Sequence, residues 1–350
     1  TAYKWSPVGT SAKKFNGVFD GDGHTISNFK FVSEKAIVGL FGYTATATVK
    51  NLNVKTDFSY EITVKTSSVI FGGVVAYNIG SDIINCSFNG NANIINTVND
   101  ENVIVFLGGI CGFMQGYNPD YTATISYCQV EGSLKSTGAY PVYAIGGVAA
   151  AIHGASVQTP ASIYNSSFAG DISGKTQNAG GIVGYLRDTA SVASCYVSGS
   201  IAAEINGQAT NAGSIAGKCD NETSLTRCVS NAAVKCNFDS SADGSQNNVG
   251  GLVYKNAYNG IDKKITVLKD NYHTTDGKVS KNGTSYDVTN VGKVCELVGW
   301  DKTDWTTENG KIVPLYDENA EKNIKVHFIF GESVTKTGLD GNPLTLTEDT

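Results

Sequence analysis

The amino-acid sequence predicts an all-β protein, a parallel β-helix (β-solenoid) of about seven coils with a cap at each end. Three observations predict this fold. A short glycine-rich phrase recurs seven times, a second apolar phrase follows six of the copies, and the composition favours strands and tight turns over helices. A repeat of this length indicates stacked copies of one structural unit, because each unit buries its apolar face only against its neighbours.

The glycine phrase sets the period of the repeat. Aligned on their second small residue, successive copies lie 34, 36, 38, 34, 33 and 37 residues apart. We interpret the apolar residue that follows, such as Leu40 or Ile182, as core, and the glycines as positions where a Cβ would clash with a neighbouring coil. A phosphate-binding loop is the alternative, but it needs a helix after the glycines and usually a lysine, and no copy has either. The copies are 38–42, 72–75, 108–112, 146–149, 180–184, 213–217 and 250–253.

The second phrase predicts short strands joined by corners. Ile83 and Cys86 both look like core residues, but they are three residues apart, which breaks the alternation of a strand. A chain that buries both has to bend between them, and Asn85 stands at the bend, as Asn51 and Asn165 do in other copies. Asparagine tolerates the left-handed backbone that such a corner can require. Helical repeats have a similar period, but the apolar residues here alternate with period two, which favours strands.

Composition and charge exclude several classes of function. The 350 residues include 40 glycines but only 6 prolines, which is typical neither of collagen nor of a proline-rich disordered chain. The net charge of -6 argues against nucleic acid as a partner, because phosphate binding needs a clustered basic surface. No apolar run approaches the roughly 20 residues of a membrane span. We predict no cofactor and a monomeric chain.

Four of the eight cysteines occupy the same place in four copies of the second phrase, as Cys86, Cys128, Cys195 and Cys228. Side chains in register on parallel strands stay about 4.8 Å apart, whereas a disulfide prefers Cβ atoms at about 3.8 Å. We therefore favour buried free thiols over disulfides, and we predict no zinc site because the chain has no CxxC pair. The other cysteines are predicted to be packing residues: Cys111, Cys219, Cys236 and Cys295.

The chain ends are predicted to differ from the repeat. We assign 1–35 to an N-terminal cap, 36–256 to the solenoid, 257–316 to a C-terminal capping segment, and 317–350 to a linker with a β-hairpin-like tail or the start of a further domain. The N-terminal cap is expected to contain a hairpin around Trp5 and a tight hairpin turn at 20–23. We expect Trp300 and Trp305 to pack over the last coil, because an open solenoid end exposes unpaired strands.

Together, these phrases resemble the GLUG-repeat family, named for its Gly-Leu-any-Gly signature. Residues 39–42 and 181–184 match the signature best. The segments 5–28 and 305–315 resemble the turns that open and close such repeats, so the likeness covers about residues 1–316.

The resemblance implies a right-handed parallel β-helix and a secreted or surface-anchored bacterial protein that is often adhesin-like. It leads us to expect an extracellular or cell-surface location, with a signal or lipid anchor removed from this sequence. The metallopeptidase activity that accompanies some of these repeats does not carry over, because the chain lacks His-Glu-x-x-His. Ser214 and Tyr254 depart from the signature, so we expect the stack to loosen in its last coils.

The candidate binding residues are tyrosines on the longest inserts between copies: Tyr117, Tyr121, Tyr140 and Tyr143. Aromatic side chains of this kind stack on sugar faces or anchor protein contacts. The sequence therefore predicts a non-catalytic, adhesin-like protein that binds a glycan or a surface protein. A structural reading, in which these tyrosines only cover the solenoid flank, stays open.

Two other functions and one metal site are weaker alternatives. Some parallel β-helices are polysaccharide lyases or glycosidases, but Arg187 and Arg227 sit in different phrases and no acidic residues occur at matching positions. A passive stalk is the second alternative. Asp20 and Asp22 could bind Ca²⁺, but they lack the downstream Glu of a calcium loop.

Overall fold

The computed structural model describes residues 3–27, 29–31, 36–63, 68–100, 103–117, 121–154, 160–205, 208–209, 211–220, 222–235, 253–254 and 267–318. The chain divides into two compact units, Thr1–Tyr316 and Asp317–Thr350. All strands and helices below belong to the first unit. The tail expected at 317–350 lies outside the described residues after Glu318, as does Cys236.

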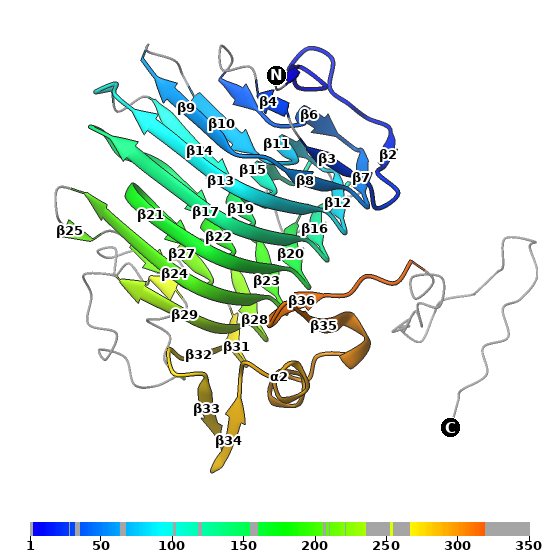
Figure 1. Ribbon diagram of the computed structural model, residues 1–350, viewed down its shortest axis with the longest axis vertical. Helices are drawn as coiled ribbons and strands as arrows, with labels where there is room; N and C mark the ends of the chain where they lie inside the picture. The colour runs from blue at the N-terminus through cyan, green and yellow to red at the C-terminus, as the bar shows by residue number, and fades with distance from the viewer. Residues whose placement is uncertain are drawn as a thin grey trace, which may run out of the picture. The chain divides into compact units, whose positions relative to one another are not determined.

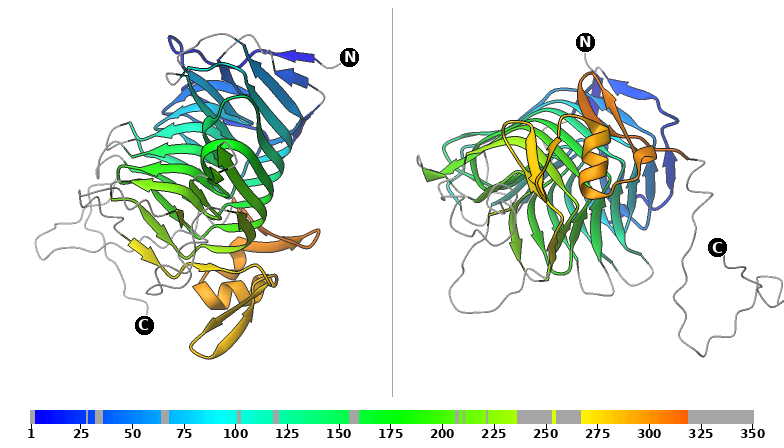
Figure 2. Two further views of the ribbon diagram at one scale, coloured as in Figure 1. Left: turned by 90° about the vertical axis from the view of Figure 1, so that its left-hand side faces the viewer. Right: turned by 90° about the horizontal axis from the view of Figure 1, so that it is seen from below.

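The first unit is a parallel β-solenoid of about six turns, consistent with a right-handed β-helix, which confirms the predicted fold class (Figure 1). In each coil the chain passes from a fifteen-stranded sheet through a seven-stranded and an eight-stranded sheet and back (Figure 2). Successive coils pair in parallel and in register, so that Ile83 lies between Val49 and Ile125.

Among the described residues, the seven-stranded sheet consists of β6 (Phe41–Ala45), β11 (Val75–Ile79), β15 (Cys111–Gln115), β19 (Ala149–His153), β22 (Val183–Arg187), β27 (Ala216–Asp220) and β30 (Val253–Tyr254). The eight-stranded sheet consists of β2 (Val18–Asp20), β7 (Thr48–Lys50), β12 (Asp82–Ile84), β16 (Ala123–Ser126), β20 (Ala161–Tyr164), β23 (Ser191–Ala193), β28 (Ser224–Thr226) and β31 (Val267–Lys269).

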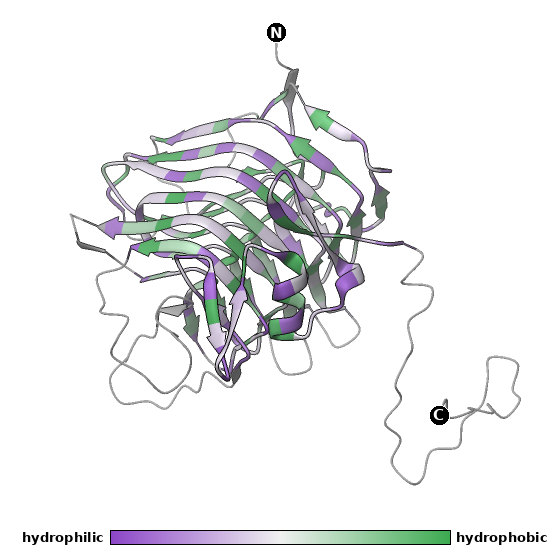
Figure 3. Ribbon diagram, turned by 60° about the horizontal axis from the view of Figure 1, so that its bottom comes forward, coloured by the Kyte–Doolittle hydropathy of each residue, from purple (hydrophilic) through white to green (hydrophobic). Residues whose placement is uncertain are grey.

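The fifteen-stranded sheet has two rows of strands that β21 joins. The row after the eight-stranded sheet contains β3 (Thr25–Ser27), β8 (Asn53–Lys55), β9 (Phe58–Ile62), β13 (Ser87–Asn96), β17 (Gln129–Gly138), β21 (Ser167–Gly180), β24 (Tyr196–Ile205), β25 (Gln208–Ala209), β29 (Val229–Lys235) and β32 (Tyr272–His273). The row before the glycine phrases contains β5 (Ile37–Val38), β10 (Ser68–Gly72), β14 (Ile104–Gly108), β18 (Val142–Gly146) and β26 (Asn211–Gly213). Hydrophilic and hydrophobic residues alternate along many of these strands, so that one face of each turns inward (Figure 3).

The described glycine phrases form the corner that leads into the seven-stranded sheet. A Cβ on Gly147 would lie 1.9 Å from the carbonyl oxygen of Gly181 in the next coil and 2.5 Å from the ring of Phe168. On Gly184, a Cβ would lie 2.7 Å from the carbonyl oxygen of Ile145. Ile182, the inward-pointing residue between Gly181 and Gly184, is fully buried. The structure therefore agrees with the interpretation of the phrase as corner and core.

The second phrase forms the corner between the eight-stranded sheet and the row that follows it. The expected left-handed backbone is present, with φ of 54° at Asn51 and 50° at Asn85. Every described copy shares it, including the copies whose corner residue is not asparagine: Tyr127, Ser194 and Arg227. A seventh copy at 267–272 turns at Asp270 with φ of 54°. We did not predict this copy, in which Asn271 follows the corner.

Where cysteine, serine or asparagine follows a left-handed corner, as Cys128, Ser166 and Asn271 do, its side chain hydrogen-bonds the neighbouring coil. The amide N–H of Cys86 donates to Sγ of Cys128 (3.4 Å), and that of Cys128 donates to Oγ of Ser166 (3.1 Å). The thiol of Cys128 in turn donates to the carbonyl oxygen of Ser126 (3.3 Å). The thiols are free and buried, as predicted, but they also serve backbone groups that the corner leaves without a strand partner. Asn271 plays the same part for the N–H of Cys228 (2.9 Å).

The prediction of hairpins in the N-terminal cap is wrong. The strand β1 (Tyr3–Trp5) pairs in parallel with β4 (Phe29–Phe31). The turn at 20–23 does not join an antiparallel pair either, because β2 and β3 pair in parallel with β7 and β8 of the first full coil. Residues 18–27 are thus a partial coil, which continues two existing hydrogen-bond ladders where a hairpin would continue neither.

The C-terminal elements gather at the end of the stack away from the N terminus (Figures 1 and 2). They are the hairpin β33 (Lys278–Lys281) and β34 (Thr284–Asp287), the helix α2 (Val291–Val298), the 3₁₀ turn η1 (Lys302–Asp304), and the hairpin β35 (Trp305–Glu308) and β36 (Lys311–Pro314).

Trp300 and Trp305 stack on each other at 4.2 Å and belong to one apolar cluster with Tyr196, Val229 and Tyr272. These three side chains occupy the first position of β24, β29 and β32. The same position in earlier coils is polar, as Ser87, Gln129 and Ser167. This position of the coil therefore changes from polar to apolar in the last coils, where the C-terminal segment packs against it. Near this end, the pairing of β27 with β30 shifts register, at the copy where Tyr254 departs from the signature.

We predict that Gly147→Ala destabilises the folded state by at least about 3 kcal/mol, because the new Cβ would overlap the backbone of the next coil. Urea denaturation followed by circular dichroism measures the change. Gly292→Ala in α2 is the matched control. Its Cβ has room, and alanine in a helix gains roughly 0.5–1 kcal/mol over glycine. Equal urea midpoints for Gly147→Ala and the unaltered protein would contradict the corner interpretation.

We also predict that the buried thiols are unreactive in the folded protein. Burial raises the pKa of Cys219 to about 12 and also raises the pKa values of Cys111, Cys128 and Cys195. At pH 8, iodoacetamide should leave these four unmodified, because the thiolate is the nucleophile, and should modify all of them in denaturant. Peptide mass spectrometry assigns each site. Alkylation of Cys128 at equal rates in the folded and unfolded states is the opposing result.

Candidate functional site

Three tyrosines are the strongly exposed aromatic side chains of the described residues, and all three border the eight-stranded sheet. Tyr117 is 57%, Tyr121 46% and Tyr164 37% exposed. The first two stand on the turn that leads into β16, and Tyr164 ends β20 in the next coil. The two sides of one sheet face therefore carry exposed rings.

The structure brings Tyr117 and Tyr121 together. The amide N–H of Tyr117 donates to the carbonyl oxygen of Tyr121 (3.4 Å). Gly80 in the coil before them makes room, since a Cβ there would lie 2.8 Å from Cβ of Tyr117. Gly80 has a φ of 55°, which few residues other than glycine adopt. The position of this pair thus depends on a glycine that sequence reasoning did not single out.

The other two predicted tyrosines lie elsewhere. Tyr140 stands on the turn between β17 and β18, where its N–H donates to the carbonyl oxygen of Asn96 (3.1 Å). Tyr143 lies within β18 and packs its ring against Phe106 at 5.6 Å and Tyr185 at 5.7 Å. The four predicted residues therefore fall in two different parts of the coil, Tyr117 and Tyr121 before β16 and Tyr140 and Tyr143 after β17.

Between the exposed rings runs a strip of hydroxyl side chains on the outer face of the eight-stranded sheet. Thr124, Ser162 and Ser191 pair in register on β16, β20 and β23, and each is partly exposed. The residues after them point inward and are fully buried, as Ile163 shows. We call Thr124, Ser162 and Ser191 the hydroxyl strip.

At one side of this strip, a half-open cleft of about 550 Å³ separates the sheet from the segment 299–304. We call it the cap cleft. Its lining consists of Ser162, Ile163, Tyr164, Asn165, Ser191, Ala193, Ser194, Arg227, Gly299, Trp300, Asp301 and Asp304. Sequence reasoning missed it, because it forms between residues more than 70 positions apart in the sequence. The one local signal was Tyr164, which stands where the neighbouring coils have Ser126 and Ala193.

Hydrogen bonds tie the two walls of the cap cleft together. Tyr127 Oη donates to Oδ1 of Asp304 (3.1 Å), and Asn165 Nδ2 donates to Oδ2 (3.2 Å). Burial raises the pKa of Asp304, although both donors favour the carboxylate. Trp300 Nε1 donates to the carbonyl oxygen of Arg227 (2.8 Å). Contacts from the corner residues of three coils, Tyr127, Asn165 and Arg227, thus hold the two walls of the cleft in place.

Asp301 and Arg227 contribute charges to this cleft. One oxygen of Asp301 accepts from the N–H (2.9 Å) and the hydroxyl (2.8 Å) of Thr303, and these bonds lower the pKa of Asp301. The side chain of Arg227 is exposed, and within the described part of the chain it forms no ion pair with a carboxylate. The other arginine, Arg187, lies on β22 of a different sheet beside Asp188.

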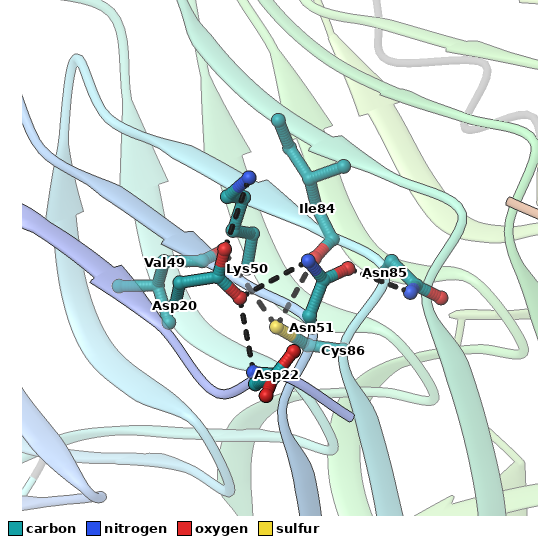
Figure 4. A network of polar contacts seen from close by, with 8 residues as sticks. All are labelled: Asp20, Asp22, Val49, Lys50, Asn51, Ile84, Asn85 and Cys86. Atoms are coloured by element: carbon teal, nitrogen blue, oxygen red, sulfur yellow. Dashed lines mark hydrogen bonds and ion pairs between the residues drawn. The ribbon is translucent and has the colours of Figure 1, made fainter. Parts of the chain in front are cut away.

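The weak metal candidate at Asp20 has protein partners instead (Figure 4). Its Oδ1 accepts from the N–H of Asp22 (3.0 Å) and from Asn51 Nδ2 (3.1 Å), and its Oδ2 lies 3.1 Å from Nζ of Lys50. These contacts, the backbone N–H first, lower the pKa of Asp20. Asn51 also accepts from Asn85 Nδ2 (2.8 Å), so Asp20 begins a ladder along the left-handed corners. Across the described ranges, no three His, Cys, Asp or Glu side chains form a group that could hold a metal ion.

Comparison with known proteins supports the family resemblance. The family model described as the GLUG motif matches residues 176–202, which run from the end of β21 into β24. No curated protein and no solved structure matches the chain. None of the helices in the described ranges is long and apolar enough to cross a membrane. Residues 176–202 thus carry the GLUG motif, and the chain is consistent with a GLUG-repeat family.

Proposed function

We propose that this protein is a non-catalytic binding module that holds a glycan against the outer face of the eight-stranded sheet. One observation carries the proposal: the exposed rings of Tyr117, Tyr121 and Tyr164 border the same face, with the hydroxyl strip between them. This arrangement is suited to a ligand that has both apolar and hydroxyl-rich surfaces.

The chemistry of sugars fits this face. The C–H groups on one side of a pyranose ring form an apolar patch that packs against an aromatic ring. The sugar hydroxyls at the ring edge donate to and accept from Ser and Thr side chains. Because the strands are held in parallel ladders, the side chains are positioned before the ligand arrives, and binding costs less ordering entropy.

We extend the proposal to an adhesin-like role at the cell surface. The support is the GLUG-repeat resemblance and the architecture, since solenoids present long regular faces that suit recognition of extended ligands. In this role the coils act as a rigid support, and the side chains at the corners and turns provide recognition.

We predict that Tyr117→Ala combined with Tyr121→Ala weakens glycan binding at least about fivefold, because each lost aromatic contact removes about 0.5–1.5 kcal/mol. Glycan arrays identify the ligand, and calorimetry measures its affinity. Ile104→Ala is the control, since Ile104 is an exposed apolar residue (39%) on β14 of another sheet.

Two results would oppose the proposal. Unchanged affinity in the double variant would remove the tyrosine pair from the site. Binding of a surface protein, with no glycan bound by the unaltered chain, would replace the glycan by a protein ligand.

A further inference from the structure

We infer that the cap cleft binds an acidic saccharide, a sugar that carries a carboxylate, and that Arg227 selects it. This inference deepens the proposed function and rests on it, because it takes the ligand to be a saccharide. It adds the class of sugar, the place of its charged group and a specificity-determining residue.

The cap cleft has the size and rigidity of a ligand site. Its volume of about 550 Å³ lies within the roughly 300–1,000 Å³ of small-ligand pockets. One wall is the outer face of β20 and β23, and the other is the segment 299–304. The bonds from Tyr127 and Asn165 to Asp304, and from Trp300 to Arg227, fix one wall against the other.

Arg227 is a charged corner residue at this cleft, and its side chain has no hydrogen-bond or ion-pair partner among the described residues. Tyr127 and Asn165, at the same corner in earlier coils, both hydrogen-bond Asp304 through their side chains. Arg227 contributes only its backbone carbonyl to Trp300. It also adopts φ of 52°, a conformation that asparagine and glycine adopt at lower cost. The guanidinium of Arg227 has no carboxylate partner among the described residues. We therefore take its partner to be an anionic group of the ligand.

A carboxylate is the anionic group that fits best. The planar guanidinium binds it through two parallel hydrogen bonds. Asp301 and Asp304 line the same cleft, so a strongly anionic ligand such as a polyphosphate would be repelled. A single carboxylate on a sugar places one negative charge at Arg227 and leaves hydroxyl groups to face the aspartates.

The remaining lining matches the rest of a sugar. Each carboxylate oxygen of Asp304 accepts one protein donor and keeps a second lone pair for a ligand hydroxyl. Ser162 and Ser191 add hydroxyls from the sheet, and the partly exposed ring of Tyr164 offers a surface for the apolar side of the sugar. The cleft thus supplies partners for hydroxyl, apolar and carboxylate groups together.

The test compares a galactose oligomer that carries a single galacturonate residue with a neutral galactose oligomer of the same length by calorimetry, using the full chain and three variants. Arg227→Asn removes the charge but keeps a residue that other copies carry at this corner, Asn51 and Asn85 among them. Tyr164→Ala removes the aromatic surface. Arg187→Asn is the matched control, since it removes the other arginine from a different sheet.

We expect the unaltered protein to bind the acidic oligomer at least about tenfold more tightly than the neutral one. Arg227→Asn should abolish that preference and leave binding of the neutral oligomer unchanged. Tyr164→Ala should weaken both, and Arg187→Asn should change neither. Circular dichroism checks that each variant keeps its fold.

Four outcomes overturn the inference. Equal affinity of the unaltered protein for both oligomers rejects the acidic ligand but leaves the proposed function standing. A preference that survives Arg227→Asn rejects the role of Arg227, and a sulfated oligomer bound more tightly than the carboxylated one rejects the carboxylate. If the unaltered protein binds no saccharide in this assay or on an array, the proposed function falls together with the inference.

Discussion

The spacing of the coils is the constraint on which the rest of the structure depends. Parallel strands lie about 4.8 Å apart, so every position of the coil has to fit between copies of itself. The glycine corner is where this is most demanding, because a Cβ on Gly147 or Gly181 would meet the backbone of the next coil at 1.9 or 2.2 Å. The glycines permit the turn, and the turn sets the direction in which the following strands leave.

The left-handed corner after the eight-stranded sheet fits the same spacing without glycine. The outward side chain of its corner residue can therefore differ from copy to copy. The backbone of this corner is left-handed in each described copy, and where cysteine, serine or asparagine follows the corner, as at Cys128, Ser166 and Asn271, that side chain bonds the neighbouring coil. Because these inward residues satisfy the backbone, the corner residue can be Asn, Tyr, Ser, Arg or Asp. Near the N terminus it continues an amide ladder from Asp20, whereas in later coils it faces the cap cleft.

The C-terminal segment changes one part of the outer surface of the solenoid, which is otherwise similar from coil to coil. It docks where one outward column changes from Ser87, Gln129 and Ser167 to Tyr196, Val229 and Tyr272. From there, Trp300 and Asp304 reach the corner residues of three coils. The repeat alone would present the same polar strip along its length, and the docked segment gives that strip a bounded cleft at one place.

The sequence by itself determined the period, the two corners, the inward residues and the free thiols, because each depends on local sterics that act on a residue and its counterpart one coil away. It did not determine that residues 18–27 form a partial coil, since an Asp-Gly turn suits a hairpin equally well until β7 and β8 offer ladders to continue. Only the tertiary structure decided which outward side chains meet. Tyr117 and Tyr121 come before β16 whereas Tyr140 and Tyr143 come after β17, so the coil separates the two pairs. The cap cleft joins Tyr164 and Arg227 to Asp301 and Asp304 through a segment that folds back onto the coils, and no periodic pattern along the chain encodes that contact.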